Sequence, residues 1–437
     1  MRLNAPRRPL LWILLGALAL RIGAALLLQH DLDFNKKRPF LITGDAEGYW
    51  ELGREIARGE PYQLYDPPRR VERMPGYPAF VAGAIRLSQA LGLAEGRQYF
   101  VARLLMALVG TANCALVALL GRELFDSRTG NLAAAAVAVA PPLIGFSAIL
   151  LSETLFAAGL LVSLWCMARL ARNADKESGF SRLLAWAGFT GLSIAIAVYV
   201  RPSWLLAAPI FAASFAMWQA RRRSLVKGML PAAVVVLVAY GALFPWAYRN
   251  HRVTGHWIST TLWVGASLYD GFNPGATGDS NLKFVDEDRL FDRLSEYEVD
   301  QHYRAKAWEY IREHPDRATW LTLGKLKRYW MPWPNAQQFG GLLPKIAVAV
   351  YFIPVLLAAA FGWLTGPRNF WAWMLTLGPI LYFCALHAIF LGSLRYRLPA
   401  EYLLCIASAI GFQQVWKLFW RGTDKEAGSS PASPAAA

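Results

Sequence analysis

The chain has 437 residues, of which 55% are hydrophobic and only 17% charged, and its formal net charge is +15. Long apolar blocks recur along it, which excludes an ordinary soluble protein and a disordered one. The blocks lack the alternating pattern of an outer-membrane β-barrel. Most basic residues lie in short loops beside these blocks, so the charge indicates membrane topology and not nucleic-acid binding. We therefore expect an all-α polytopic membrane protein.

Hydropathy predicts about ten transmembrane helices, each close to the roughly 20 residues that a bilayer core requires. They lie near residues 9–29, 100–120, 131–150, 153–170, 183–200, 203–219, 229–248, 345–364, 370–391 and 398–419. The first block resembles a signal peptide, but it is long and has no small-residue cleavage site before Asp31. We expect it to be retained as the first helix.

A further apolar segment at 75–93 decides the topology. It contains Pro75, Pro78 and Arg86, and a charged side chain is costly at the bilayer centre. We therefore expect this segment to be an interfacial helix and not a transmembrane span. Ten spans then place both termini on the side of the basic loops, including the Arg-Arg-Arg run at 221–223. The positive-inside rule assigns that side to the cytoplasm.

This topology divides the chain into four parts. They are an N-terminal transmembrane module at 1–248 with a first outer loop at 30–99, an outer loop domain at 249–344, C-terminal transmembrane helices at 345–420 and a tail at 421–437. A helical pattern after Gly44 predicts an interfacial helix in the first outer loop as well. The outer loop domain is polar and rich in turn formers, so we expect a small mixed domain. The tail is poor in bulky residues, and we expect it to be disordered.

Most of the unusual polar motifs fall on the predicted outer side. They are Asp45 and Glu47 in TGDAEGYW, Arg73 in RMPGYP, Ser152 and Glu153 in LSETLF, Arg201 in YVRPSW, Arg249 and Asn250 in PWAYRN, and Arg395 and Arg397 in LRYRLP. Because these motifs lie at the ends of separate spans, we expect them to converge on one surface. Acidic and arginine groups beside lipid suit a reaction on a substrate with a charged head and an apolar tail.

The order of these motifs resembles the bacterial members of glycosyltransferase family 39. The matching motifs are GDAEGYWELGREIARGEPY, RMPGYPAF, LSETLF, PWAYRNHRVTG, REHP and LRYRLPAE, and the likeness runs from about residue 9 to about residue 419. Relatives include protein O-mannosyltransferases, aminoarabinose transferases and RgtABCD-like sugar transferases, which share the integral-membrane GT-C fold. The resemblance implies a multi-pass protein of the bacterial inner membrane that performs an inverting sugar transfer on its outer face. The donor would be a polyprenyl-phosphate-linked sugar, and the acceptor an unknown glycan, lipid or protein.

The resemblance also implies roles for individual residues. It matches an essential aspartate of the family to Asp45, and a carboxylate base on an acceptor hydroxyl typically contributes about 10² to 10⁴ in rate. Glu47 is the second candidate catalytic carboxylate, but two residues apart on a helix it would face another way and orient an arginine or the acceptor. Arginines would stabilise the leaving phosphate, and the candidates are Arg73, Arg201, Arg249, Arg395 and Arg397. Candidates for substrate positioning are Tyr49, Tyr77, Glu153, Asn250 and Tyr396.

Simpler interpretations stand beside these. Asp45 could be only a helix N-cap, Arg201 and Arg249 interface anchors, and Arg21 either a snorkelling residue or a partner of Glu401. Asp45 and Glu47 could hold a divalent cation, but the sequence supplies few further ligands nearby, so we predict no required metal or cofactor.

Two other functions compete with sugar transfer: a lipid or solute transporter, and a non-catalytic assembly subunit. A transporter would tend to carry its polar residues near the bilayer midplane, whereas here they gather at one boundary. If the protein were a non-catalytic assembly subunit, Asp45 and the arginines would have no shared function. Partners besides the donor and acceptor would be membrane lipids.

Overall fold

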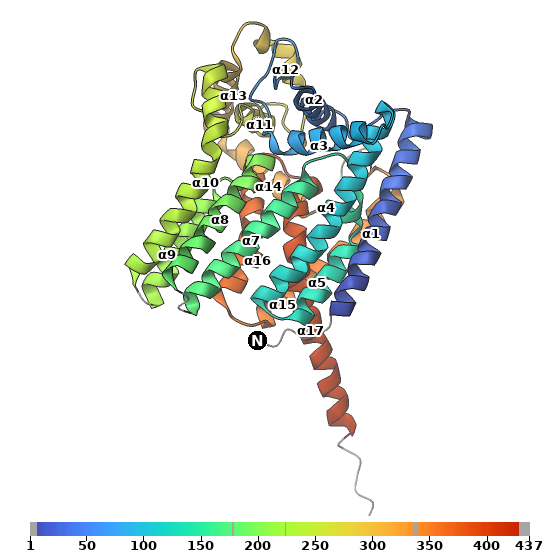
Figure 1. Ribbon diagram of the computed structural model, residues 1–437, viewed down its shortest axis with the longest axis vertical. Coiled ribbons are helices and arrows are strands. Elements are labelled where there is room, and N and C mark those ends of the chain that lie inside the picture. The colour runs from blue at the N-terminus through green and yellow to red at the C-terminus, as the bar shows by residue number, and fades with distance from the viewer. Residues whose placement is uncertain (1–6, 177–178, 223, 335–338, 428–437) are drawn as a thin grey trace, which may run out of the picture.

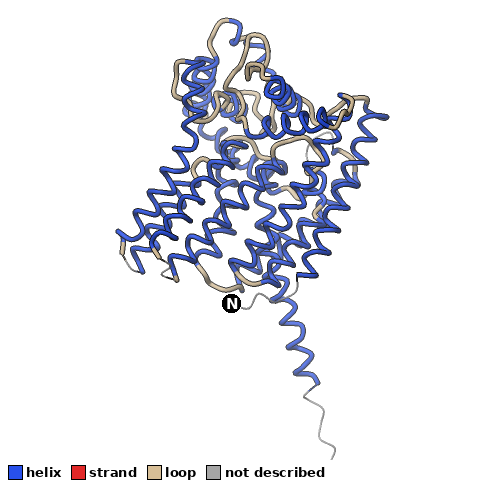
Figure 2. The backbone as a smooth tube through the Cα atoms, in the orientation of Figure 1, coloured by secondary structure: helices blue, strands red, loops and turns tan. Residues whose placement is uncertain are grey.

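The computed structural model describes residues 7–176, 179–222, 224–334 and 339–427, and its long helices run side by side while shorter helices lie across one end (Figure 1). Figure 2 shows that loops gather at the same end. The helices are α1 (Arg7–His30), η1 (Asp31–Lys36), α2 (Asp45–Arg58), α3 (Gly76–Ala90), α4 (Glu95–Leu124), α5 (Ser127–Val139), α6 (Pro141–Phe146), α7 (Glu153–Asp175), α8 (Phe180–Val200), η2 (Pro202–Trp204), α9 (Ala207–Arg222), α10 (Leu225–Thr254), α11 (Val264–Gly271), α12 (Lys283–Asp288), η3 (Leu290–Asp292), α13 (Glu296–Glu313), α14 (Pro315–Trp330), α15 (Leu342–Thr365), α16 (Phe370–Ile389) and α17 (Leu394–Ala427).

The all-α polytopic architecture predicted from the sequence is confirmed, but the count of ten spans is not. Within the described residues, eight helical segments are long and apolar enough to cross a membrane. They are Pro9–Lys36, Glu95–Leu124, Glu153–Asp175, Phe180–Val200, Pro202–Arg222, Lys227–Thr254, Leu342–Thr365 and Phe370–Ile389. The predicted spans at 131–150 and 398–419 are not among them.

The predicted span at 131–150 is broken, because Pro141 and Pro142 lack the backbone N–H that a continuous helix requires. Helix α5 ends at Val139, and Ala140 has an extended backbone with φ −66° and ψ 111°. Arg21 donates hydrogen bonds of 3.1 Å to the Val137 carbonyl and 3.3 Å to the Ala138 carbonyl, which satisfies two carbonyls freed by the break. Arg21 therefore does not pair with Glu401.

The chain nevertheless crosses the bundle between α4 and α7. Asp126 lines a crevice with Lys417, and Glu153 forms an ion pair with Arg395. Lys417 and Arg395 lie about 22 residues apart on α17, which is roughly 33 Å of helix. Residues 127–152 thus connect opposite ends of the bundle as a broken segment.

Two helix ends differ from the predicted boundaries. Helix α10 continues to Thr254, so the boundary predicted at 248 falls inside a helix. Helix α17 continues to Ala427, beyond the predicted start of the tail at 421, and the rest of that tail, residues 428–437, lies outside the described residues.

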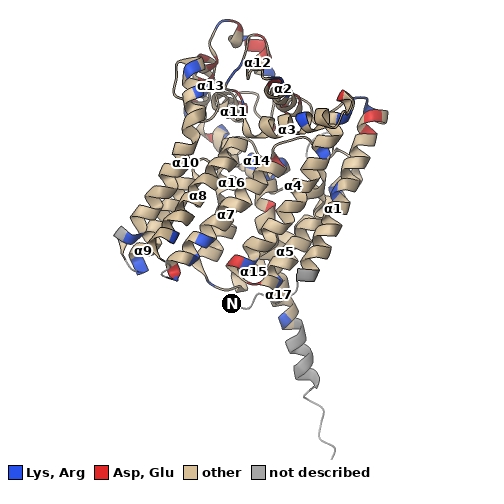
Figure 3. Cartoon of the chain, in the orientation of Figure 1, with Lys and Arg blue, Asp and Glu red and all other residues tan. Residues whose placement is uncertain are grey.

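Helices α2 and α3 lie across one end of the bundle, which we call the α2–α3 end (Figure 1). Their close contact depends on glycine, since a β-carbon at Gly53 would lie 2.7 Å from Val81 Cβ. A β-carbon at Gly76 would lie 2.6 Å from the Tyr199 carbonyl oxygen at the end of α8. Charged residues concentrate at the two ends of the molecule, while the long helices between them are mostly uncharged (Figure 3).

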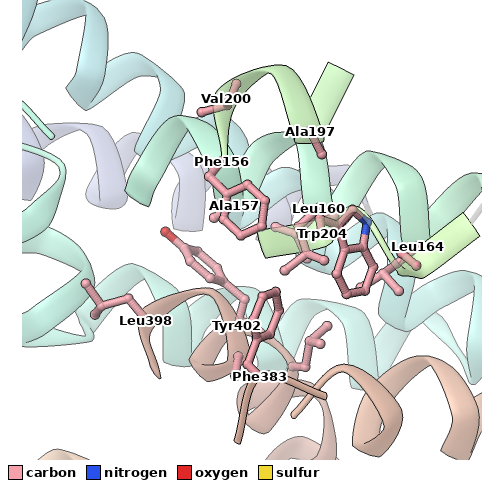
Figure 4. Close-up of a cluster of buried hydrophobic side chains, with 14 of the residues drawn as sticks. Phe156, Ala157, Leu160, Leu164, Ala197, Val200, Trp204, Phe383, Leu398 and Tyr402 are labelled. Carbon is pink, nitrogen blue, oxygen red and sulfur yellow. The ribbon is translucent and has the colours of Figure 1, made fainter. Parts of the chain in front are cut away.

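A buried apolar cluster fixes the helices that reach the α2–α3 end (Figure 4). The Phe383 ring stacks on Trp204 at 5.5 Å between centroids and meets Phe156 edge-on at 5.9 Å. Tyr402 of α17 is buried in the same cluster. Glu153 lies three residues before Phe156, and Arg201 lies three residues before Trp204. The packing of these two aromatic rings therefore also fixes the positions of the two charged residues.

We expect the two ends of the bundle to face opposite sides of a membrane. Cysteine substitutions at exposed Glu309 on α13 and exposed Arg221 on α9 should show this. An impermeant thiol reagent should label E309C in intact spheroplasts and R221C only after lysis, with the parent chain as the control for native cysteines. Labelling of both variants before lysis would contradict this topology.

Candidate active site

A cluster of charged side chains lies at the α2–α3 end, assembled from the ends of separate helices. Asp45 begins α2, and its two carboxylate oxygens accept hydrogen bonds from Arg73 at 2.9 Å and from Arg395 at 2.7 Å. Arg395 also donates through Nε to Glu153, the first residue of α7. Arg201, directly after α8, donates to the same oxygen of Glu153 at 2.7 Å. Side chains that lie up to 350 positions apart in the sequence, such as Asp45 and Arg395, thus meet in one ionic network.

The ionic network is buried on the side of Glu153 and accessible on the side of Asp45. The Glu153 side chain is only 2% exposed, whereas that of Asp45 is 34% exposed. A buried carboxylate needs compensating charge, which Arg201 and Arg395 supply. Glu153 therefore anchors the two arginines, and Asp45 is the carboxylate that a molecule approaching from outside would meet.

Aromatic side chains surround the ionic network. The Tyr49 hydroxyl lies 3.4 Å from Ser152 Oγ, and the Arg73 guanidinium lies 4.8 Å from the Tyr49 ring. Tyr77 meets Tyr49 edge-on at 4.9 Å, and its buried hydroxyl has no hydrogen-bond partner among the described residues. Tyr396 lies beside Arg201 and Arg395, whose guanidinium carbons are 5.7 and 5.8 Å from its ring centre.

The two arginines control the protonation of Asp45. Burial raises the pKa of this carboxyl, but the positive charges of Arg395 and Arg73 outweigh burial and hold the pKa well below its usual range. Asp45 therefore stays ionised at neutral pH, and the stability from these pairs is lost only as the pH falls through the depressed pKa. A carboxylate bound this way is a weak base until one of its arginines is withdrawn.

The loop that carries Arg73 is held from several sides. Glu296 of α13 accepts backbone hydrogen bonds from Arg70 at 2.8 Å and from Val71 at 2.9 Å. Arg69 forms a 3.1 Å ion pair with Glu72, and its guanidinium carbon lies 3.7 Å from the centre of the Phe291 ring. Glu72 in turn lies 3.6 Å from Arg73. The segment containing α11–α14 thus fixes a residue of the ionic network without entering it.

Arg249 supports the same loop, and Asn250 supports the segment that follows α10. Arg249 donates to the carbonyl oxygens of Arg70 at 2.6 Å and Tyr62 at 3.0 Å. Asn250 is buried and donates to the Ile258 carbonyl at 2.9 Å. The structure does not bring either side chain into contact with Asp45, so the sequence expectation that Arg249 joins the cluster is not met.

Glu47 and Arg397 also have partners outside the ionic network. Glu47 is exposed and accepts a 3.0 Å hydrogen bond from the backbone N–H of Gly44, which caps the start of α2. Arg397 is fully buried and forms a 2.8 Å ion pair with Glu401. It also donates to the carbonyl oxygens of Tyr329 and Met331, which joins α17 to the end of α14.

A cavity of about 350 Å³ adjoins the ionic network at Arg395 and Tyr396. Its lining is mainly apolar and includes Pro142, Phe146, Val348 and Leu394. Arg328, paired with Asp279 at 2.8 Å, adds a second guanidinium to the lining. Sequence reasoning missed Arg328, since it lies in an amphipathic helix with no motif around it. In the described part of the chain, no group of three or more His, Cys, Asp or Glu side chains could hold a metal ion.

Arg397→Leu should destabilise the protein, because it leaves the carboxylate of Glu401 buried without a counterion. Breaking a buried pair on one side costs about 3–5 kcal/mol, whereas replacing both partners by apolar residues costs much less. The melting temperature of R397L in detergent should fall well below that of the parent, and R397L/E401L should recover part of the loss. Equal melting temperatures for R397L and the parent would show that this ion pair is not structural.

Comparisons with known proteins support the resemblance found in the sequence. The dolichyl-phosphate-mannose-protein mannosyltransferase family model matches residues 77–248. No curated protein sequence matches the chain significantly.

Solved structures share the fold. The archaeal oligosaccharyltransferase AglB from Archaeoglobus fulgidus, in complex with an inhibitory peptide and a dolichol-phosphate, matches with a TM-score of 0.55 at 15% identity, over 96% of this chain and 52% of that one. The apo oligosaccharyltransferase of that organism gives 0.59 at 14% identity, over 97% and 53%. ArnT from Cupriavidus metallidurans bound to undecaprenyl phosphate gives 0.39 at 16% identity, over 91% and 77%, which is too low for a fold assignment.

The chain therefore spans about half the length of the archaeal oligosaccharyltransferases it matches. The family match and the shared architecture together confirm the GT-C fold and the resemblance to glycosyltransferases of that fold.

Proposed function

We propose that this protein is an inverting glycosyltransferase that moves a sugar from a polyprenyl-phosphate donor to an acceptor on the outer face of the bacterial inner membrane. The observation that carries this proposal is the sharing of Arg395 between the partly exposed carboxylate of Asp45 and the buried carboxylate of Glu153. The family match and the dolichol-phosphate bound by the archaeal oligosaccharyltransferase support a lipid-phosphate donor.

The cavity beside Arg395 is the proposed donor site. A donor of this class has an apolar chain and an anionic phosphate, and the cavity offers an apolar lining with guanidinium groups at Arg395 and Arg328. Arg201 lies next to Arg395 through their common partner Glu153. Arginines suit phosphate because their N–H groups bind its oxygens in pairs.

Binding of the donor would also activate Asp45. A phosphate that takes hydrogen bonds from Arg395 withdraws that charge from Asp45, and the pKa of the carboxyl then rises toward its usual range. Asp45 next removes a proton from the acceptor hydroxyl or amine, and the acceptor atom forms a bond to the anomeric carbon. The bond from that carbon to the phosphate oxygen breaks, and the phosphate leaves with the electron pair, stabilised by arginine. Attack opposite the leaving group inverts the anomeric centre.

The remaining side chains of the ionic network have supporting tasks in this proposal. Arg73 holds the second oxygen of Asp45, so the carboxylate keeps its direction when Arg395 turns to phosphate. Tyr49 and Tyr396 flank the arginines and suit contacts with the sugar or acceptor. Four other candidates contact only the protein itself and have no proposed role toward the substrates: Glu47, Arg249, Asn250 and Arg397.

Asp45→Asn should abolish sugar transfer, because asparagine keeps the shape of the side chain but cannot accept a proton. The measurement is turnover of a radiolabelled polyprenyl-phosphate sugar by membranes. Glu47→Gln is the matched comparison, since glutamine preserves the helix cap. E47Q should retain activity within about threefold, as expected for a surface cap. Parent-level turnover by D45N would exclude Asp45 as the base, and a transporter or assembly subunit would release no polyprenyl phosphate in this assay.

Arg395→Gln should raise the KM for the donor about tenfold or more, because a hydrogen bond to a charged group contributes roughly 1.5–3 kcal/mol. Arg249→Gln removes the same charge at the same end of the bundle but should lower thermal stability and leave the donor KM close to that of the parent. Steady-state kinetics with varied donor and fixed acceptor distinguish the two variants. A larger effect on donor KM from R249Q than from R395Q would contradict the proposed phosphate contacts.

A further inference from the structure

A second cavity lies at the end of the bundle opposite the ionic network. It has a volume of about 350 Å³ and lies where α4, α7 and α9 end and α16 begins. Leu124, at the end of α4, also lines the neighbouring crevice that contains Lys417, which places the cavity at the far end of α17 from Arg395. We call this cavity the α9–α16 crevice. None of its lining residues takes part in the proposed sugar transfer.

The α9–α16 crevice carries an excess of positive charge. Its lining includes Arg172, Arg222 and Arg368 but only two acidic residues, Glu123 and Asp175. Arg172 pairs with Glu123 at 2.9 Å, and Arg222 pairs with Asp175 at 2.9 Å. Arg368 is exposed and forms no ion pair within the described ranges. One guanidinium therefore remains available for an anion.

A buried indole N–H adds a second, independent sign of a missing acceptor. Trp371 lines the α9–α16 crevice and is 8% exposed, yet its Nε1 has no hydrogen-bond partner among the described residues. A buried donor without an acceptor is unfavourable, because water satisfied it before folding. Because the Nε1 atom is itself enclosed, the indole has to turn toward the crevice before an oxygen atom of a bound molecule can complete this hydrogen bond.

The surroundings of the crevice belong to the membrane boundary. Helices α7, α9 and α16 each lie in segments apolar enough to span a bilayer, and the crevice lies at their ends. Trp218 and Trp371 form part of its lining, together with the small residues Ala168 and Ala171. Phe370, at its edge, is 49% exposed. Tryptophan and arginine side by side are typical of the headgroup level of a membrane.

We propose that the α9–α16 crevice binds the phosphate headgroup of an anionic phospholipid from the leaflet next to the basic loops. The phosphate oxygens would accept hydrogen bonds from Arg368 and from the Trp371 indole, and the acyl chains would follow the apolar helix surfaces into the bilayer. A soluble phosphate has the same headgroup chemistry but would gain nothing from the apolar surroundings. The site is independent of sugar transfer, so its test does not depend on the proposed function.

Native mass spectrometry of the purified full-length protein in neutral detergent tests this proposal. The probes are phosphatidylglycerol and phosphatidylcholine with identical acyl chains, and separately inorganic phosphate as a competitor. The parent should retain phosphatidylglycerol preferentially, and R368Q should bind it about fivefold more weakly, as expected for one arginine near a membrane surface. Trp371→Phe, which keeps the ring and removes the N–H, should weaken binding as well.

Arg221→Gln is the matched control, because it removes the same charge one residue away from Arg222 at a position that does not line the crevice. R221Q should bind phosphatidylglycerol within about twofold of the parent. Melting temperatures measured without added lipid identify any variant that fails to fold. We expect R368Q to fold like the parent, because Arg368 is exposed. Equal retention of the two lipids, equal loss in R221Q and R368Q, or displacement of the lipid by millimolar phosphate would overturn the proposal.

Discussion

The ion pairs of Arg395 with Asp45 and Glu153 are the interaction on which the site depends. They join the first residue of α2, the first residue of α7 and the start of α17. Each of these side chains sits at a helix end, so its position follows from the packing of a whole helix. The apolar cluster around Phe156, Trp204 and Phe383 holds the helices rigid below the charges. The guanidinium of Arg395 thereby links the buried carboxylate of Glu153 to the partly exposed carboxylate of Asp45.

Supporting contacts keep the loops at this end in place. Arg103 of α4 is nearly fully buried and donates to Gln29 at 2.8 Å and to the Pro39 carbonyl at 2.6 Å, which tethers the segment leading to α2. Glu296 and Arg249 perform the equivalent task for the loop before Arg73. Arg103 and Arg249 therefore bind backbone carbonyl oxygens, which explains why a positive charge at the α2–α3 end does not by itself identify a residue of the ionic network.

Sequence reasoning predicted the all-α architecture and gathered Asp45, Arg73, Glu153, Arg201 and Arg395 at one boundary, because the predicted topology puts the first outer loop and the outer span ends on the same side. It did not separate these residues from Arg249, Arg397 and Glu47, since the choice between a carbonyl, a carboxylate and a helix cap depends on tertiary contacts. The break at Pro141 and Pro142 was visible in the sequence, but hydropathy averages over it. Arg328 and the α9–α16 crevice have no motif and emerge only from the packing of distant helices.

In the proposed mechanism, a lipid phosphate and Asp45 compete for Arg395. A cryo-electron microscopy structure of the protein with a polyprenyl phosphate bound tests this directly. We expect phosphate density against Arg395 and Arg201, with the distance from Arg395 to Asp45 increased beyond hydrogen-bonding range and Arg73 still bound to Asp45. Phosphate density away from these arginines, or an intact contact between Arg395 and Asp45 in the lipid-bound protein, would contradict it.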